Sequence, residues 1–222
     1  MTYRDQNNAP SPELTALVRK AEIHLSEADP QLGQLIHDLG PCPLANYVMD
    51  PFDSLVWTVI GQQISSAAAA SITARLREIA GGGIFTPTAL DQLDTETLRS
   101  AGLTRNKTRT LQEISTKIID GDLDMTALNS ATDDEVMQRL CQYYGIGPWT
   151  VEMLLMFGLG RIDVFSGGDL ALRKAIGLLY EHDSPPDAAE SNKIAQRWAP
   201  YRTVASWYLW RTVDPLSEPP AI

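Results

Sequence analysis

The most informative stretch of the chain reads Tyr143-Tyr144-Gly145-Ile146-Gly147-Pro148-Trp149-Thr150. Two glycines that flank one aliphatic residue let the backbone turn through left-handed conformations and approach a ligand closely. Pro148 suits the first position of a following helix. The unpaired N–H groups of such a turn and helix start attract anions, most often a phosphate. The stretch therefore predicts either a phosphate-binding hairpin between two helices or a plain helix connection.

A second glycine turn follows and ends on a carboxylate. It reads Asp163-Val164-Phe165-Ser166-Gly167-Gly168-Asp169 and leads into an apolar helical segment. Asp169 suits two roles, which the pattern leaves open. It is either a reactive carboxylate beside a bound phosphate or the N-cap of the helix that begins at Leu170.

Capping residues and glycines mark helices along nearly the whole chain, and no segment shows the alternating pattern of a strand bounded by hairpin turns. Thr132 and Glu135 have capping-box spacing, which predicts the start of the first hairpin helix. The second should run from Pro148 to about Leu159. Other helices are predicted to begin at Ser11-Pro12, with Gly40-Pro41 closing that section, at Asp53, running through Gln62-Gln63 to Ala80, at Asp94, at Thr104, running to Asp120, and near Asp169, Asp187 and Arg202.

Composition is that of a compact globular enzyme, with 222 residues, 44% hydrophobic and 21% charged. The chain has no apolar stretch long enough to span a membrane and no secretory signal at its N-terminus, so we expect a cytoplasmic protein. Cys42 and Cys141 cannot supply the four thiolates of an iron–sulfur cluster. The three histidines show no ligand spacing, so we expect no catalytic metal.

The formal charge of −10 opposes a nucleic-acid partner, since 28 acidic residues face 18 basic ones. Local distribution offsets this objection, because a basic cluster surrounds one predicted turn and helix. The alternative for this cluster is an ordinary solvated helix face. Its members are Arg99, Arg105, Lys107, Arg109 and Lys117.

Taken together, these motifs resemble the helix-hairpin-helix DNA glycosylases, and within that superfamily the DNA-3-methyladenine glycosylase II family. The resemblance runs from about Asp50 to Arg211 and keeps the family's order. Beyond the hairpin it rests on Asp50-Pro51-Phe52 leading into Gly61-Gln62-Gln63-Ile64-Ser65, on Gly102-Leu103-Thr104-Arg105-Asn106-Lys107, and on Trp198-Ala199-Pro200-Tyr201-Arg202-Thr203 with Trp207-Tyr208-Leu209-Trp210-Arg211.

The resemblance implies an all-α helix-hairpin-helix glycosylase fold, with two helical lobes and the active-site cleft between them. Only 50 residues precede Pro51, so we expect the form without the family's N-terminal mixed α/β domain. Residues 1–222 would form a single glycosylase core. Its motif-bearing helices would lie at about 50–118 and 119–211, with the hairpin at about 132–159.

The implied activity is DNA repair. Members of the family flip alkylated bases, such as 3-methyladenine or 7-methylguanine, out of double-stranded DNA and hydrolyse the N-glycosidic bond. Asp169 would stabilise the oxocarbenium ion or activate the attacking water. Trp149 stands where members that also cut the backbone have a lysine, so the enzyme should be monofunctional. We expect it to act as a monomer.

The resemblance also assigns binding residues. Trp149 and Trp210 would line the base pocket, while Met153 and Leu170 replace aromatics that are common there. Gln63 aligns with the residue that fills the gap left by the flipped base. No cofactor is required, although main-chain carbonyls of Cys141, Tyr143 and Ile146 would hold a Na⁺ or K⁺ ion. The remaining DNA contacts implied are Gly145, Ile146, Gly147, Thr150, Arg105 and Lys107.

Three other functions fit parts of the sequence. A glycosylase for oxidised or mismatched bases would share most of these motifs. A non-catalytic helix-hairpin-helix DNA-binding module would share the hairpin but has no use for Asp169 or for the tryptophan pair. A protein-interaction scaffold fits the acidity and explains none of the motifs.

Overall fold

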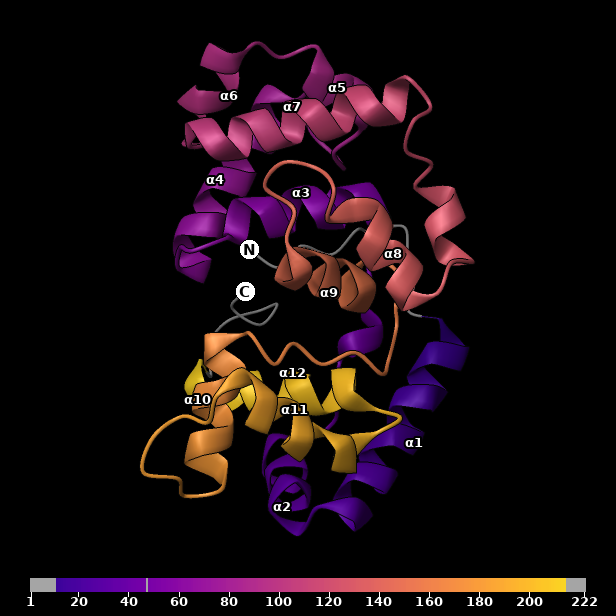
Figure 1. The fold of residues 1–222 in the computed structure, drawn as a ribbon, viewed down its shortest axis with the longest axis vertical. Coiled ribbons are helices and arrows are strands. Elements are labelled where there is room, and N and C mark those ends of the chain that lie inside the picture. The colour runs from indigo at the N-terminus through magenta and orange to yellow at the C-terminus, as the bar shows by residue number, and fades with distance from the viewer. Residues whose placement is uncertain (1–10, 47, 215–222) are drawn as a thin grey trace. The chain divides into compact units, whose positions relative to one another are not determined.

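The computed structural model describes residues 11–46 and 48–214, and all regular structure in these residues is helical. The predicted all-α class is therefore confirmed. The helices form two compact units (Figure 1). The hairpin unit contains residues 49–159, and the terminal unit contains the described residues before 49 and after 159. No helix in the described ranges is long and apolar enough to cross a membrane.

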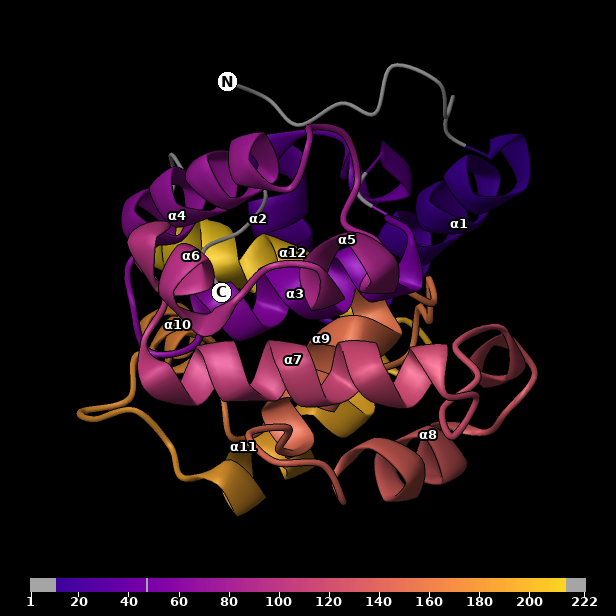
Figure 2. The same cartoon turned by 90° about the horizontal axis from the view of Figure 1, so that it is seen from above.

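The hairpin unit is built around α3, a helix whose residues are nearly all buried. Helices α4, α7 and α9 pack against α3, and α5 lies along α7 (Figure 2). Helix α9 is buried along most of its length, as its apolar sequence predicts. The elements are α3 (Pro51–Gly61), α4 (Ser66–Ile79), α5 (Pro87–Asp91), α6 (Thr95–Ser100), α7 (Arg105–Ile119), η2 (Thr126–Asn129), α8 (Asp133–Leu140) and α9 (Pro148–Phe157).

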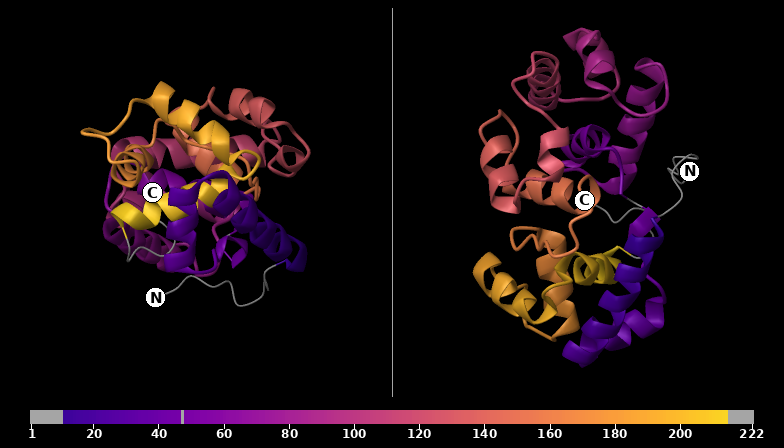
Figure 3. Two further views of the ribbon diagram at one scale, coloured as in Figure 1. Left: turned by 90° about the horizontal axis from the view of Figure 1, so that it is seen from below. Right: turned by 90° about the vertical axis from the view of Figure 1, so that its right-hand side faces the viewer.

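The terminal unit combines helices from two separate parts of the sequence, the described residues before 49 and those after 159. Helix α12 packs against α10, α1 and α2 (Figure 3). It is buried along most of its length, including the side chains of Tyr208 and Trp210. The elements are α1 (Pro12–Ala28), α2 (Pro30–Leu39), η1 (Leu44–Asn46), α10 (Leu170–Leu179), α11 (Ala188–Ala195), η3 (Gln196–Trp198) and α12 (Arg202–Val213).

The buried carboxylate of Asp29 ties this unit together. Its Oδ1 caps α2 by accepting the N–H groups of Gln31 and Leu32. Its Oδ2 accepts hydrogen bonds from the Tyr180 hydroxyl and from Trp198 Nε1, the latter at 3.0 Å. Burial alone would raise the pKa of Asp29, but these hydrogen bonds outweigh it and hold the pKa below its ordinary value.

Most predicted helix starts are confirmed, because the residues that signalled them are the caps. Ser11, Asp94, Thr104 and Asp187 each accept a backbone N–H from the first turn of the helix that follows. Thr132 and Glu135 form the expected capping box at the start of α8.

The single helix predicted from Asp53 to Ala80 is wrong. The chain forms α3 and α4 instead, separated by the segment 62–65. Asp50 is the N-cap of α3, whereas the Asp53 carboxylate is buried and bonded to Arg77 and to the Phe85 N–H. Helix α3 ends at Gly61 because Gln62 has an extended ψ of 125°, and Gln63 beyond it has a φ of 59°, in the left-handed region.

Candidate active site and DNA interface

The hairpin turn connects α8 to α9 through tight main-chain bonds. The Tyr143 N–H donates to Leu140 O, and the Ile146 N–H donates to Tyr143 O at 3.2 Å. Gly145 has a φ of 76°, which an L side chain rarely adopts. A Cβ there would also lie 2.1 Å from Thr110 Oγ1 on α7. The turn therefore needs glycine at this position, for its backbone conformation and for its packing.

Gly147 differs from the prediction. Its φ of −110° and ψ of 176° are extended, so the expected left-handed conformation is absent at the second glycine. The reason is its place as N-cap of α9, where extended backbone is usual for any residue. Nothing lies within 4 Å of a Cβ built there, so this side of the turn is open.

The first turn of α9 has no capping side chain. Among the α-helices of the described ranges, α9 and α12 begin in this way. For α12 another segment supplies partners, since the Arg202 N–H donates to Asp163 Oδ1 and the Thr203 N–H donates to Ile162 O. Helix α9 instead begins with Gly147-Pro148, and its positive end is suited to an anion.

The Gln63 loop, residues 62–65, lies between α3 and α4. Gln63 itself is exposed. The side chain of Gln62 bridges to the hairpin, because its Nε2 donates to Gly145 O at 3.0 Å and to Thr150 Oγ1 at 2.9 Å. This role of Gln62 was not predicted from the sequence, since both partners lie more than 80 positions away.

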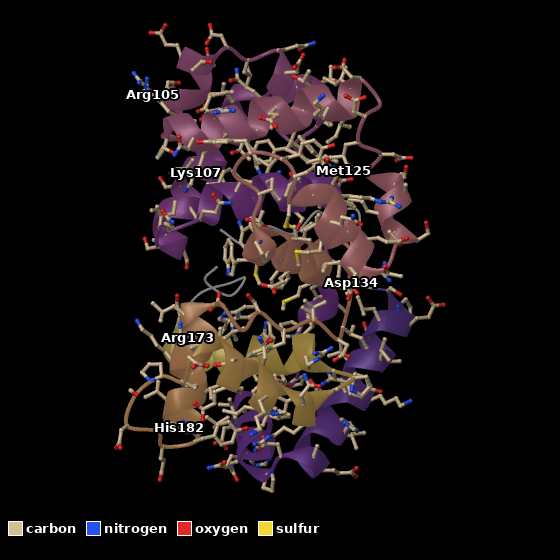
Figure 4. All side chains as sticks on the ribbon, in the orientation of Figure 1. Arg105, Lys107, Met125, Asp134, Arg173 and His182 are labelled. Carbon is tan, nitrogen blue, oxygen red and sulfur yellow. The ribbon has the colours of Figure 1, made fainter. Side chains whose placement is uncertain are left out.

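Lys107 does not lie on the exposed basic surface that was predicted. It is only 8% exposed, and its ammonium group donates to Ile60 O and Gln62 O, both at 2.7 Å. Burial lowers the pKa of Lys107. Figure 4 shows Arg105 at the outer edge of the unit and Lys107 within it. Lys107 therefore supports the end of α3, and we no longer expect it to contact DNA.

Arg109 and Glu113 hold the hairpin turn from α7. The Arg109 guanidinium lies 3.8 Å from the centroid of the Tyr144 ring, and the Tyr144 N–H donates to Glu113 Oε1 at 3.4 Å. The ring and the main chain of Tyr144 thus both contact α7.

Two predicted DNA contacts on the hairpin have buried side chains. Ile146 points into the core, and Thr150 Oγ1 accepts the hydrogen bond from Gln62. Their side chains as placed offer DNA no surface, so a contact at either position would be through the main chain.

Asp169 caps α10. Its Oδ1 accepts the Leu172 N–H at 2.8 Å, and the residue is 7% exposed. Helix N-termini favour a negative charge at this position. The structure confirms the N-cap role, and this role does not exclude a reactive one, because the cap holds the carboxylate in a fixed direction.

The segment that leads to Asp169 is held by the start of α12. Arg202 binds the Asp163 carboxylate through Nε at 2.8 Å and Nη2 at 3.0 Å, a two-bond geometry that fixes direction. Thr203 Oγ1 donates to Arg161 O at 2.7 Å and accepts the Val164 N–H at 3.0 Å. Arg202 and Thr203 lie in a motif that resembles the family, but the sequence alone does not predict this contact.

The predicted pocket residues have different environments. Trp149 is half-buried. Met153 and Trp210 are 0% and 1% exposed, the burial of core side chains, whereas Leu170 is 55% exposed. As placed, Met153 and Trp210 have no surface for a base, so Trp149 is the aromatic candidate that we retain.

The predicted cation ligands are carbonyls of the hairpin turn. Cys141 is the C-cap of α8, where the helix end is negative. Tyr143 O accepts one N–H and keeps a second lone pair. The turn therefore offers oxygen atoms suited to a hard cation. No group of three His, Cys, Asp or Glu side chains in the described residues could hold a metal ion.

Known proteins resemble this chain over most of its length. Residues 56–200 match the family model described as HhH-GPD superfamily base excision DNA repair protein. DNA-3-methyladenine glycosylase 1 of Schizosaccharomyces pombe is 34% identical over 209 residues, which cover 90% of each chain.

Two solved structures are also similar. That of Schizosaccharomyces pombe 3-methyladenine DNA glycosylase (Mag1) in complex with abasic DNA has a TM-score of 0.81 and 36% identity, and the match covers 87% of this chain and 96% of that one. DNA-3-methyladenine glycosidase from Bacillus halodurans has a TM-score of 0.72 and 34% identity, covering 89% and 91%.

Proposed function

Because this chain belongs to the HhH-GPD superfamily of base excision DNA repair proteins, we propose that it removes alkylated bases from double-stranded DNA and leaves abasic sites. The observation that carries the proposal is Asp169, a carboxylate that is nearly buried and fixed at the start of α10. The similar proteins named as 3-methyladenine glycosylases support the same substrate class.

The chemistry requires a carboxylate that is both oriented and charged. A base must leave the stack before its C1′ can be attacked, and cleavage of the N-glycosidic bond then builds positive charge on the sugar. The Asp169 carboxylate stabilises that charge or accepts a proton from the attacking water. A base alkylated at N3 or N7 is cationic and leaves readily, so no strong general acid is needed.

In this proposal the hairpin binds the DNA backbone. No side chain caps the start of α9, and nothing lies within 4 Å of a Cβ built at Gly147, so a backbone phosphate has room to bind beside this positive helix end. A Na⁺ or K⁺ ion on the carbonyls of Cys141, Tyr143 and Ile146 would reduce the negative charge of the turn. Trp149 then stacks on the cationic base.

The proposed reaction ends at the abasic site. Strand cleavage by the superfamily's lyases uses an amine that forms a Schiff base with the sugar, and the indole of Trp149 cannot do so. We propose a monofunctional enzyme that acts as a monomer.

Incubation with methylated duplex DNA tests the proposal. We expect 3-methyladenine or 7-methylguanine to be released and identified by mass, with the strands left intact until alkali treatment. Borohydride should trap no protein–DNA adduct. Release of an oxidised base alone would replace the alkylated substrate class, and a trapped adduct would show that a lysine elsewhere is the nucleophile.

A further inference from the structure

Gln63 has a backbone conformation that residues other than glycine rarely adopt. A φ of 59° is uncommon for a residue other than glycine, and such residues persist where their surroundings hold them. The side chain is exposed, as a residue must be if it is to enter a base stack. The neighbouring contacts should therefore explain what keeps Gln63 in place.

Lys107 provides the first support. Its Nζ donates to the carbonyls of Ile60 and Gln62, which lie on either side of Gly61 at the end of α3. A cation is favoured at the negative end of a helix, and here it is buried against that end. The main chain on the N-terminal side of Gln63 is thus anchored to α7.

The side chain of Gln62 provides the second support and reaches the hairpin. Its Nε2 donates one hydrogen to Gly145 O at 3.0 Å and the other to Thr150 Oγ1 at 2.9 Å. An amide nitrogen has two hydrogens, so both are used. Gly145 belongs to the turn proposed to bind phosphate, and Thr150 belongs to the first turn of α9.

We propose that Gln62 is a positioning residue that connects the Gln63 loop to the hairpin turn. A phosphate bound at the turn then sets where Gln63 enters the base stack, because the two elements share the donors of one side chain. This inference rests on the proposed function and on the expectation, drawn from the sequence, that Gln63 fills the gap left by a flipped base. It assigns Gln62 a role in that function, because its two hydrogen bonds would couple phosphate binding at the hairpin to base flipping at Gln63.

A double-substitution cycle tests this coupling. The variants are Gln62→Glu, which keeps the length but loses both donors, Gln63→Ala, and the two combined. Gln62→Met serves as a second variant without donors, in case the glutamate disturbs folding. Gln112→Ala is the matched control in the same unit, because Gln112 accepts a bond from Thr95 on another helix. Thermal unfolding shows which variants are folded.

The rate of 7-methylguanine release is measured in single turnover, with enzyme in excess over a duplex that carries one lesion. We expect each substitution in the Gln63 loop to slow release about tenfold, as loss of one or two neutral hydrogen bonds can do. The combined variant should be no slower than the slower single variant, because Gln62 acts through Gln63. Affinity for undamaged duplex should stay within about threefold, since the hairpin amides remain.

A second duplex, in which the lesion lies opposite an abasic site, tests whether the coupling acts on base flipping. When the lesion faces an abasic site it is already unpaired, so flipping costs less. The Gln62 variants should recover most of the lost rate on this duplex, while Gln112→Ala should match the unmodified protein on both.

Two results would overturn the inference while leaving the function intact: multiplicative losses in the combined variant, or wild-type release by both Gln62 variants. If the unmodified protein releases no base from methylated DNA, the proposed function fails and the coupling fails with it.

Discussion

The Oδ1 atom of Asp169 accepts the Leu172 N–H, so the cap itself fixes where the carboxylate points. We predict that Asp169→Asn keeps the fold, since asparagine caps helices as well as aspartate does. Base release should fall by at least about 10²–10³, because an amide cannot neutralise the sugar cation. Single-turnover release and thermal unfolding measure the two effects separately.

Asp187 offers a matched control for this substitution. It caps α11 in the same unit, with its Oδ1 accepting the Glu190 N–H at 2.8 Å. Asp187→Asn should leave base release unchanged. If Asp169→Asn also releases base at nearly the wild-type rate, Asp169 is a structural cap and has no part in the chemistry.

Asp29 carries no proposed chemistry, and it supports stability instead. We predict that Asp29→Asn lowers the free energy of unfolding by about 1–3 kcal/mol, because Trp198 Nε1 loses its acceptor in a buried site. Urea unfolding of both proteins at neutral pH measures the difference.

The same pair of proteins should show a pH dependence of defined sign. The pKa of Asp29 in the folded state lies below the ordinary value of 3.8. The stability that this carboxylate contributes is therefore fully present above pH 3.8 and is lost as the pH falls through the folded-state pKa. The gap between wild type and Asp29→Asn should be constant at neutral pH and should narrow in acid. A gap that widens in acid would contradict this assignment.

Helix starts were the most predictable elements, because an N-cap is a local signal. A Ser, Thr or Asp side chain bonds an N–H group two or three residues ahead, so the sequence contains both partners. The capping box of Thr132 and Glu135 is one such case. The same reasoning failed at Asp53, whose partners Arg77 and Phe85 lie 24 and 32 positions away.

In the candidate site, too, the residues in short sequence motifs were predictable, and those with distant partners were not. Gly145, Gly147 and Asp169 lie in short motifs, and the structure gives each a defined place in a turn or cap. Lys107 was misplaced because its burial depends on carbonyls of α3 that only the tertiary fold brings near. Gln62 was missed for the same reason.

The two hairpin glycines should respond differently to substitution. Gly145→Ala should lower the free energy of unfolding by about 1–3 kcal/mol or more, because it combines a positive φ with a clash against Thr110. Gly147→Ala should leave stability within about 1 kcal/mol, since its backbone is extended and the space beside it is open. Urea unfolding measures both.

The DNA affinity of the Gly147→Ala protein tests whether a phosphate binds in the open space beside Gly147. If a phosphate approaches there, the added methyl group should weaken binding to every DNA sequence alike. A Gly147→Ala protein that is stable and binds DNA normally would move the phosphate site away from the start of α9.

The net negative charge of the whole molecule opposes DNA binding. A chain with a net charge of −10 repels a polyanion at long range. One of the predicted basic residues, Lys107, is buried, and a second, Arg109, is exposed but already has two partners, the Tyr144 ring and the Glu113 carboxylate, 4.0 Å from its Nε. Fewer cations than expected are therefore available for phosphates, which increases the share of binding that main-chain amides must supply.

This reasoning predicts a shallow dependence of DNA affinity on salt. A protein that makes six to ten cationic phosphate contacts loses roughly 10³–10⁵ in affinity between 50 and 200 mM salt, because each contact releases counterions. We expect a clearly smaller loss here, measured by fluorescence anisotropy with undamaged duplex. Replacing the exposed Arg99 and Arg105 by glutamine should weaken binding less than Gly147→Ala does. A steep salt dependence that disappears in the arginine variant, while Gly147→Ala binds normally, would make the arginines the DNA anchor in place of the hairpin.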